Sequence, residues 1–211
     1  QLMCTRPPRS TQGFTLIEVM VVVSLISIML MLAAPTISLW LQNIRIRNSA
    51  EAMLNGLQTA RMEAMRRNTR VTLWLVSSTT SGCALSASGP SWIIPLGAAP
   101  PTTLSDGCAN AIYQNGGATV QRHSANAAML GIDIAAQNAG GGAADCVTFD
   151  GLGQVPAQGT IACDNPITEV NMSSTTVETV PLRVTLTTGG QARMCYPDAA
   201  NQLKATDPRK C

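Results

Sequence analysis

Residues 13–18 of the chain are Gly-Phe-Thr-Leu-Ile-Glu, and they begin a long apolar run. From Thr15 to Ala34 the run has 20 residues and one charge, Glu18. A helix of this length spans the roughly 30 Å hydrocarbon core of a bilayer, where backbone groups must bond to one another. The sequence therefore predicts a transmembrane helix, and Arg6 and Arg9 ahead of it predict a cytoplasmic N-terminus.

Two features distinguish this segment from a secretory signal peptide. The apolar run is longer than a signal-peptide core, and no small-x-small cleavage site follows it. A carboxylate inside a membrane helix is also costly, so Glu18 is by default a functional residue that requires a partner. The alternative is a plain signal anchor that tolerates a glutamate near the membrane interface.

The hexapeptide resembles the class III signal of type IV prepilins and type II secretion pseudopilins. In that family a membrane peptidase cuts after the glycine, and the new N-terminal phenylalanine is N-methylated. The resemblance implies that Gly13 is the cleavage residue, Phe14 the first mature residue and Glu18 the assembly glutamate. Cleavage would create an ammonium group at Phe14, which Glu18 of a neighbouring subunit would neutralise inside the bilayer.

These assignments divide the chain into three parts. Residues 1–13 are expected to be a cleaved prepilin leader, and residues 14–41 a transmembrane and filament-core helix. Residues 42–211 are long enough for one periplasmic domain with its own core. The protein would then be a single-pass inner-membrane protein before assembly and part of a pilus or pseudopilus afterwards.

Composition and charge limit the classes of function. Aromatic residues make up 3% and charged residues 12% of the chain, which suits a β-rich exported domain better than a helical bundle. The net charge of +2 is too small to indicate a general nucleic-acid-binding surface. Residues 42–70 and 183–211 are basic, whereas residues 71–182 are acidic. Charge complementarity within one fold, or between stacked subunits, explains this distribution of charge better than a binding patch does.

The chain has seven cysteines, and Cys4 lies in the expected leader. The other six imply an oxidising compartment and a disulfide framework, but six cysteines allow 15 pairings. We expect neighbours in sequence to pair, as Cys83–Cys108, Cys146–Cys163 and Cys195–Cys211. No Cys-x-x-Cys pair occurs and His123 is the sole histidine, so neither a metal nor another cofactor is expected.

Beyond the apolar run, the periodicity predicts one helix and then strands. Apolar residues between Ala50 and Ala64 have the spacing of a helix with one buried face, so the helix should extend from about Phe14 to about Arg67. From Arg70 the period changes to two. Strands are expected at residues 71–76, 92–94, 129–134, 146–149, 180–187 and 191–196, and a flexible loop at residues 135–144.

Two hairpins are expected among these strands. Asp150-Gly151 predicts a turn between residues 146–149 and 154–155, and this role is preferred over calcium binding by Asp150. Residues 188–190 would join the last two strands. The predicted class is α+β, in which one long N-terminal helix, membrane-spanning in its first half, packs on antiparallel sheets.

Residues 57–73, 149–153 and 190–195 together resemble the GspH/FimT family. The first of these matches the helix-to-strand junction of that family, whose usual string is roughly A-R-S-E-A-x-R-R-N. The resemblance implies the type IV pilin fold and a minor pilin that enters a type IV pilus or primes its assembly, at or near the tip. Its partners would be other major and minor pilins, the prepilin peptidase and the inner-membrane assembly platform.

A DNA-binding pilin for natural transformation is an alternative. Family members that bind DNA have a C-terminal Gly-Arg-x-Arg pattern, and here Gln191 replaces its first arginine, which puts that role in doubt. Binding would depend on Arg193 with Lys204, Arg209 and Lys210. No aromatic cluster beyond Tyr196 offers a base-stacking platform.

A minor pseudopilin of a type II secretion system is a further alternative. The Cys195–Cys211 loop argues against it, because this loop resembles the C-terminal disulfide loop of pilins. An enzyme is not expected. His123 has no patterned partner, and no nucleophile or phosphate-binding motif occurs.

Overall fold

The computed structural model describes residues 13–80, 83–96, 119–125, 131–156, 163–174, 179–197 and 206–211, and only the helical backbone of residues 33–35. The chain divides between Ser38 and Leu39 into two units. Helix α1 (Leu16–Arg67) runs through both of them. Several residues of the sequence predictions lie outside the described ranges: most of the leader, Cys4, Cys108, Met129, Leu130 and Lys204.

In the N-terminal unit, α1 presents apolar side chains in every direction. The large apolar side chains between Phe14 and Leu32 are 49% to 83% exposed. The hydroxyls of Ser24 and Ser27 donate to carbonyls one turn earlier, each at 2.8 Å, so these polar groups are satisfied within the helix. Among the described residues, no single helix has both the length and the apolarity to cross a membrane, although the bent pair Leu16–Leu32 and Thr36–Arg67 meets these criteria together.

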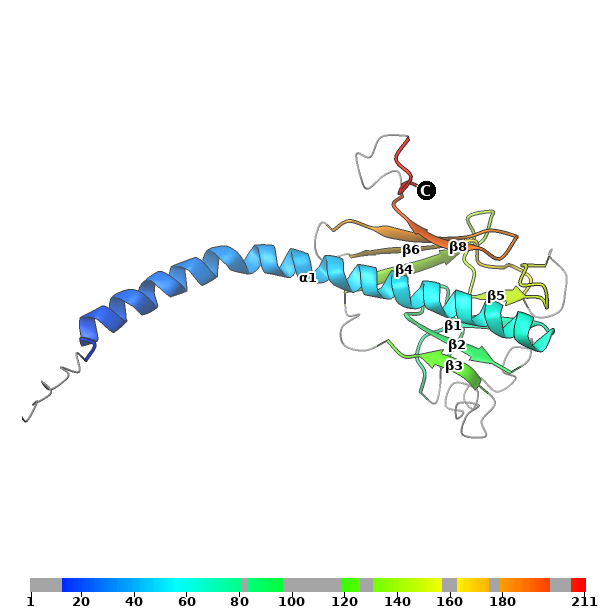
Figure 1. Ribbon diagram of the computed structural model, residues 1–211, viewed down its shortest axis with the longest axis horizontal. Coiled ribbons are helices and arrows are strands. Elements are labelled where there is room, and N and C mark those ends of the chain that lie inside the picture. Colours follow the sequence, from blue (N-terminus) through cyan, green and yellow to red (C-terminus); the bar gives the residue numbers. More distant parts are fainter. Residues whose placement is uncertain are drawn as a thin grey trace, which may run out of the picture. The chain divides into compact units, whose positions relative to one another are not determined.

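The second unit contains two antiparallel sheets of four strands each, which are drawn beside the C-terminal half of α1 in Figure 1. The first sheet has the order β3 (Thr119–His123), β2 (Ser91–Pro95), β1 (Val71–Val76) and β5 (Cys146–Phe149). The second has the order β4 (Ile132–Gln137), β6 (Glu169–Ser174), β7 (Leu182–Leu186) and β8 (Ala192–Cys195). The predicted combination of one long helix with antiparallel sheets is confirmed.

One face of α1 joins both sheets in a common core, as the helical spacing predicts. Its buried residues are Ile46, Ala50, Met53, Leu57, Ala60 and Ala64. They contact inward-facing residues of the first sheet, such as Leu73 and Phe149, and of the second, such as Met172 and Val184. Gly56 permits a close approach of α1 to β2, since a Cβ atom there would lie 2.7 Å from the Trp92 ring.

The first sheet is buried on its other face as well. Trp74 and Val76 of β1 belong to a second, smaller cluster with Ile93 and Cys146. The hydroxyls of Thr72 and Thr148 meet across β1 and β5 at 2.8 Å in this buried setting. Strand β1 is therefore buried along its whole length, which accounts for its nearly continuous run of β-branched and aromatic residues.

The strand predictions are correct for β1, β2, β5, β7 and β8 and partly correct for β4, and they miss β3 and β6. The expected loop at residues 135–144 begins too early, because β4 extends to Gln137 and Ala143 forms a bridge with it. Small alanine side chains conceal the alternation there, since Ala136 is buried and Ala135 exposed. Strands β3 and β6 are not predicted, and β6 contributes only Val170 and Met172 to the core.

The hairpin expected at Asp150 is also wrong, although the turn itself is present. The Asp150 carboxylate accepts hydrogen bonds from the amides of Leu152 and Gln154, each at 2.9 Å. The chain beyond the turn does not pair back onto β5. The Val155 amide instead donates to the Thr188 carbonyl at 2.9 Å, and β5 pairs with β1.

His123, the sole histidine, is the last residue of strand β3, a strand that was not predicted from the sequence. Its ring stacks on Trp92 with 5.6 Å between the ring centroids. Burial against this neighbour lowers the pKa of His123, because the charged form loses hydration. The histidine is thus a packed residue of the first sheet.

Three charged residues form an ion-pair cluster in the last turns of α1. Arg66 donates two hydrogen bonds to the Glu63 carboxylate at 2.8 and 2.7 Å, and Arg67 donates a third. The pKa of Glu63 falls from its ordinary 4.5 to about 2, chiefly because Arg66 binds the charged form, while burial acts in the opposite direction. Glu63 and Arg67 stand four residues apart, a spacing that favours an ion pair on a helix, and the same carboxylate also binds Arg66.

Replacing this carboxylate should make stability less dependent on pH. Above pH 4.5 Glu63 is ionised in both states, so Glu63→Gln should lower the free energy of unfolding by about 2 kcal/mol. As the pH falls from 4.5 towards 2 the unfolded chain takes up the proton first, and the difference between the two proteins should shrink. Urea unfolding of the full chain at a series of pH values measures this.

Glu51→Gln is the matched control. Glu51 pairs with Arg47 at 3.0 Å on the exposed side of α1, where such a pair contributes about 0.5 kcal/mol or less. A stability loss in Glu63→Gln that stays constant between pH 7 and 2 would contradict the role of the ion-pair cluster.

Candidate functional site

The residues of the predicted processing signal lie at the start of α1. Gly13 precedes the helix, and a Cβ atom there would meet nothing within 4 Å. Phe14 is 83% exposed, and Glu18 is exposed in the first helical turn. In the described part of the chain, no cation lies within ion-pair distance of the Glu18 carboxylate.

The first turn of α1 also contains a helix cap that was not predicted from the sequence. The Thr15 hydroxyl accepts a hydrogen bond from the Glu18 amide at 3.3 Å and caps the helix. Thr-x-x-Glu is the spacing of a capping box, so the signal was present in the sequence. Because the observed bond uses the backbone of Glu18, its carboxylate stays available for another partner.

Arg61 of α1 connects two turns that are distant from it in sequence. Its Nε atom donates to the carbonyl oxygen of Gly153 at 3.0 Å. Its Nη2 atom donates to the carbonyl oxygen of Gly189 at 3.3 Å. We call Arg61 and the two turns that contain Gly153, Gly189 and Gly190 the Arg61 junction.

Glycine is required at the centre of the Arg61 junction. Gly190 has φ 74°, and a Cβ atom there would fall 1.9 Å from the Gly153 carbonyl oxygen. Gly153 has φ 75°, and a Cβ atom there would lie 2.9 Å from Met65 Sδ. Gly190 therefore excludes larger residues both by backbone conformation and by space, and Gly153 excludes them by backbone conformation.

The end of α1 adjoins the same junction. Asn68 ends the helix in the left-handed conformation with φ 51°, which asparagine tolerates better than most residues. A Cβ atom at Gly151 would lie 2.5 Å from Asn68 Oδ1, so these residues also touch closely. The three stretches with family resemblance thus meet in space at one place, a connection that the sequence did not predict.

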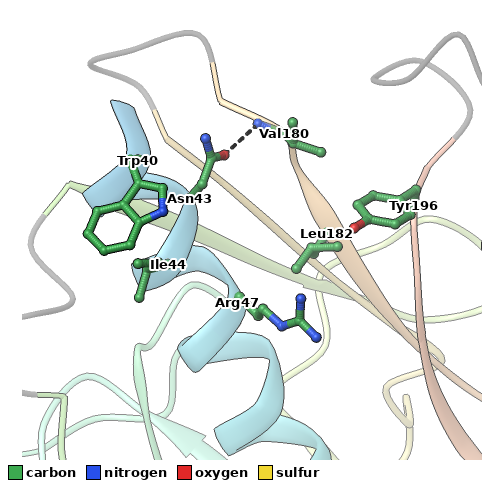
Figure 2. A pocket seen from close by; sticks show the side chains of 7 residues that line it. All are labelled: Trp40, Asn43, Ile44, Arg47, Val180, Leu182 and Tyr196. Atoms are coloured by element: carbon green, nitrogen blue, oxygen red, sulfur yellow. Dashed lines mark hydrogen bonds between the residues drawn. The ribbon is translucent and has the colours of Figure 1, made fainter. Parts of the chain in front are cut away.

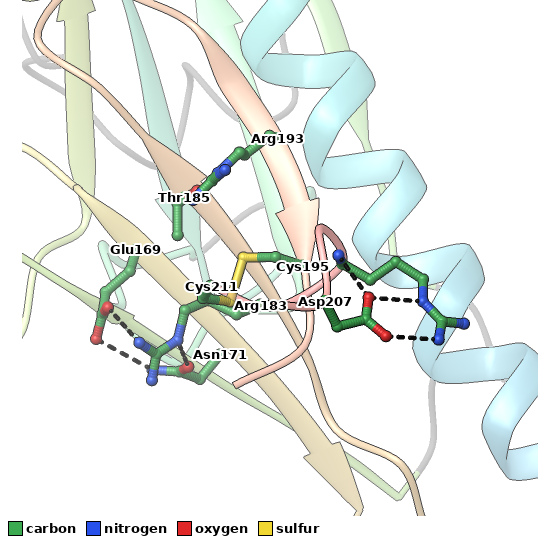
Figure 3. The surroundings of a disulfide bond; sticks show 9 residues. Glu169, Asn171, Arg183, Thr185, Arg193, Cys195, Asp207 and Cys211 are labelled. Atoms are coloured by element: carbon green, nitrogen blue, oxygen red, sulfur yellow. Dashed lines mark hydrogen bonds and ion pairs between the residues drawn. A yellow bond between two sulfur atoms is a disulfide. The ribbon is translucent and has the colours of Figure 1, made fainter. Parts of the chain in front are cut away.

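Among the proposed DNA-binding residues that the structure describes, Arg193 and Arg209 differ in how far their charge is compensated. Arg193 is exposed on β8, where its guanidinium donates a long hydrogen bond of 3.4 Å to the Thr185 hydroxyl (Figure 3). Arg209 forms two hydrogen bonds with the Asp207 carboxylate at 3.1 and 2.9 Å. This pairing lowers the pKa of Asp207 to about 2 and raises the pKa of Arg209. The charge of Arg209 is therefore largely compensated.

Two further basic residues belong to this region. Lys210 forms a parallel β-bridge with Tyr196. Arg183 on β7 donates to Asn171 at 2.6 Å and pairs with Glu169 at 2.9 Å, so its charge is compensated as well (Figure 3). Lys204 lies outside the described residues. Arg193 is exposed, and its described side-chain contact is with the Thr185 hydroxyl.

The two disulfides that the structure describes each join a cysteine to the next cysteine along the chain, as expected. Cys146 bonds to Cys163, and Cys195 bonds to Cys211. Cys83 is also disulfide-bonded, while Cys108 lies outside the described ranges. The second bond attaches the C-terminal segment to β8, and the Tyr196 backbone exchanges hydrogen bonds with Arg209 and Cys211 at 2.8 and 3.0 Å. Among the residues described, no group of three or more metal-ligating side chains is arranged to hold a metal.

Two protein-family models match the chain. The prokaryotic N-terminal methylation motif matches residues 8–34. The model of the type II transport protein GspH matches residues 49–196, which is more than half of the chain. No curated protein matches at a significant level.

Solved structures that resemble this one include the type IV minor pilin FimU of Pseudomonas aeruginosa in two crystal forms. One is 13% identical over 70% of this chain and 90% of the other, with a TM-score of 0.45. The second is 14% identical over 71% of this chain and 87% of the other, with a TM-score of 0.44.

Small substitutions within the Arg61 junction should lower the stability of the second unit. Gly190→Ala should lower the free energy of unfolding by about 2 kcal/mol or more, because it combines a strained φ with contact to the Gly153 carbonyl. Arg61→Met, which keeps the aliphatic stem but no donor, should cost about 1–3 kcal/mol. Thermal unfolding of the full chain in detergent measures both effects.

The neighbouring residue supplies a matched control. A Cβ atom at Gly189 would meet only the Thr187 hydroxyl at 3.8 Å, so Gly189→Ala should be close to neutral. Equal effects of alanine at residues 189 and 190 would show that the junction does not depend on the Gly190–Gly153 contact.

Proposed function

The chain belongs to the family of the type II transport protein GspH, and from this membership we propose that it is a minor type IV pilin that enters a pilus or primes its assembly. The family and the fold are those of structural pilin-type proteins. Such a protein is anchored in a membrane by its N-terminal segment and interacts with other pilins and with the assembly machinery.

The apolar surface of the N-terminal unit carries this proposal. A helix that is apolar on all sides is stable only when lipid or other protein covers it. The exposed side chains from Phe14 to Leu32 meet this description, and they lie within residues 8–34, which match the methylation motif. Lipid before assembly and neighbouring pilin helices afterwards would cover them in turn.

We place residues 14–41 in the inner membrane as a single pass and residues 42–211 in the periplasm until assembly. Prepilin peptidase would remove residues 1–13, with Gly13 at the cleavage site and Phe14 as the methylated residue. The exposed, non-helical position of Gly13 supports access by a protease. The inner-membrane assembly platform would then pass the subunit to the major and minor pilins.

Glu18 would act in assembly by neutralising the Phe14 ammonium of a neighbouring subunit. Two observations support this role. The Glu18 carboxylate has no cationic partner among the described residues, and the helix cap uses only the Glu18 amide. A buried carboxylate without a partner is costly in lipid, so a neighbour that supplies an ammonium group is favoured.

A pilus is favoured over a type II secretion pseudopilus because the Cys195–Cys211 bond closes a C-terminal loop of the kind that is common in pilins. Location at or near the tip would follow from the resemblance to minor pilins. DNA capture remains a second candidate function, supported by the exposed Arg193, whose described side-chain contact is with the Thr185 hydroxyl.

The assembly role of Glu18 can be separated from its part in the helix cap. Glu18→Ala keeps the backbone amide and therefore the bond to Thr15, so the second unit should unfold as in the original chain. Incorporation into sheared filaments, measured by immunoblotting, should fall at least about tenfold. Glu18→Gln, similar in size but uncharged, should be equally defective, while Gly13→Val should leave an uncleaved precursor. Normal incorporation of Glu18→Ala would remove the assembly role.

The DNA candidate function predicts a graded loss of salt dependence. The full chain in zwitterionic nanodiscs should bind duplex DNA with micromolar affinity that falls steeply as salt rises. Arg193→Ala should lower the slope of the logarithmic salt dependence by about one. Arg209→Ala should change it less, because Asp207 already compensates this arginine. Absence of binding at low salt would remove DNA capture and leave the structural role.

A further inference from the structure

Two adjoining hollows lie between α1 and the second sheet, and together we call them the α1–β7 cleft. The first has a volume of about 280 Å³, and its own lining residues are Trp40, Asn43, Ile44 and Val180 (Figure 2). The second has a volume of about 300 Å³, and its own lining residues are Met194, Cys195 and Arg209. Both hollows are also lined by Arg47, Leu182 and Tyr196, so they form one continuous cleft within the unit Leu39–Cys211.

One end of the α1–β7 cleft is apolar. Trp40 and Ile44 of α1 lie opposite Val180, and the Trp40 and Val180 side chains are 62% and 39% exposed. The Asn43 side-chain oxygen accepts a hydrogen bond from the Val180 amide at 3.0 Å, which ties α1 to the segment before β7 (Figure 2). The width of this end is therefore fixed, and it offers room for an aliphatic chain.

The other end of the cleft contains hydrogen-bond donors without acceptors. Arg47 uses its Nε atom to bind Glu51 at 3.0 Å, and Arg209 uses Nε and Nη2 to bind Asp207 at 3.1 and 2.9 Å. Within the described residues, the Nη atoms of Arg47, the Nη1 atom of Arg209 and the Tyr196 hydroxyl form no hydrogen bond. Guanidinium groups and hydroxyls are the donors that suit the oxygen atoms of a phosphate group.

The geometry and charge of these donors favour a phosphodiester of low net charge. Figure 2 shows the Arg47 guanidinium and the Tyr196 hydroxyl pointing into the space between α1 and the strand that carries Leu182. Glu51 and Asp207 compensate the charge of the two arginines. The cleft therefore recognises hydrogen-bond acceptors and not net negative charge, which is the chemistry of a zwitterionic phospholipid headgroup.

The two ends of the cleft follow one another along α1 in the order that a phospholipid requires. Trp40 belongs to residues 14–41, which we place in the membrane, and tryptophan is enriched at the interface between membrane and water. Arg47 lies seven residues later, about 10 Å farther along the helix at 1.5 Å per residue. The apolar end thus lies nearer the membrane segment in the chain, and the donors lie farther from it, as acyl chain and phosphate do in the outer leaflet.

We propose that the α1–β7 cleft binds one zwitterionic phospholipid from the periplasmic leaflet of the membrane. Its phosphodiester accepts hydrogen bonds from Arg47, Arg209 and Tyr196. One of its acyl chains lies in the apolar end, between Trp40 and Val180. The site depends on the membrane placement proposed for the N-terminal segment, and it adds to that placement a lipid contact made by the second unit.

Photolabelling of the full chain in nanodiscs tests this site. The probe is phosphatidylethanolamine with a diazirine in one acyl chain. After irradiation and proteolysis, mass spectrometry should find the lipid adduct on residues 179–182 as well as on residues 16–32. The adduct on residues 16–32 arises in any membrane-spanning helix and serves as the internal standard, whereas residues 179–182 acquire the label when an acyl chain enters the cleft.

Variants and a second probe make the test specific. Arg47→Gln and Tyr196→Phe should each lower the ratio of the two adducts at least about fivefold, because each removes donors to the phosphate. The thermal unfolding temperature should stay the same, since the Arg47–Glu51 pair is exposed and the Tyr196 hydroxyl has no described partner. Arg193→Gln, an exposed arginine on β8 outside the cleft, is the matched control and should leave the ratio unchanged.

The second probe is a diacylglycerol with the same photoreactive chain but no phosphodiester. It should label residues 16–32 as well as phosphatidylethanolamine does, and residues 179–182 at least about fivefold less. Equal labelling of residues 179–182 by the two probes would show that the cleft accepts any lipid chain and does not recognise the headgroup.

The outcomes also separate this site from the proposed function. Labelling of residues 16–32 without residues 179–182, or a ratio that neither Arg47→Gln nor Tyr196→Phe lowers, overturns the lipid site and leaves the membrane placement intact. Absence of label from residues 16–32 removes the membrane placement as well. A specific adduct on residues 179–182 together with normal filament incorporation of Glu18→Ala supports the lipid site and removes the assembly role.

Discussion

The second unit depends on one stripe of small and aliphatic side chains along α1. Ala50, Ala60 and Ala64 bring the helix backbone close to the strands, and Gly56 admits the Trp92 ring. Because the stripe contacts both sheets, the two sheets share one core although they use different strands. A glycine inside a helix costs roughly 1 kcal/mol relative to alanine, so its presence at residue 56 is explained by the room it leaves for Trp92.

Next to this core, the Arg61 junction holds two separate turns against the end of α1. A guanidinium group suits this task because its donors lie in a plane and point in several directions at once. The two carbonyl groups it binds belong to turns that follow β5 and β7. The stretches that resemble the GspH/FimT family therefore have a structural explanation: they supply the arginine, the asparagine that ends the helix, and the glycines that let three backbone segments touch.

Sequence periodicity predicted the parts of this fold in which one face is strongly apolar, namely the buried stripe of α1 and strands β1 and β5. It did not identify β6, whose outward residues are polar and whose inward face has only Val170 and Met172. An Asp-Gly pair predicts a turn, but it does not specify with which strand the chain pairs after the turn. The hydrogen bonds of Arg61 span 92 and 128 residues in sequence, and their acceptors are backbone carbonyl groups. No pattern of side chains in the sequence could therefore predict them.

The two described disulfides make the folding of the second unit depend on thiol oxidation. They link cysteines 17 and 16 residues apart, and closing a loop of this size removes roughly 3 kcal/mol of conformational entropy from the unfolded chain. Together they amount to a large part of the roughly 5–15 kcal/mol by which a native domain is stable. A chain whose cysteines are still reduced would hold the segment after β8 only weakly. Oxidation of the cysteines thus acts as a maturation step that precedes any use of the domain surface.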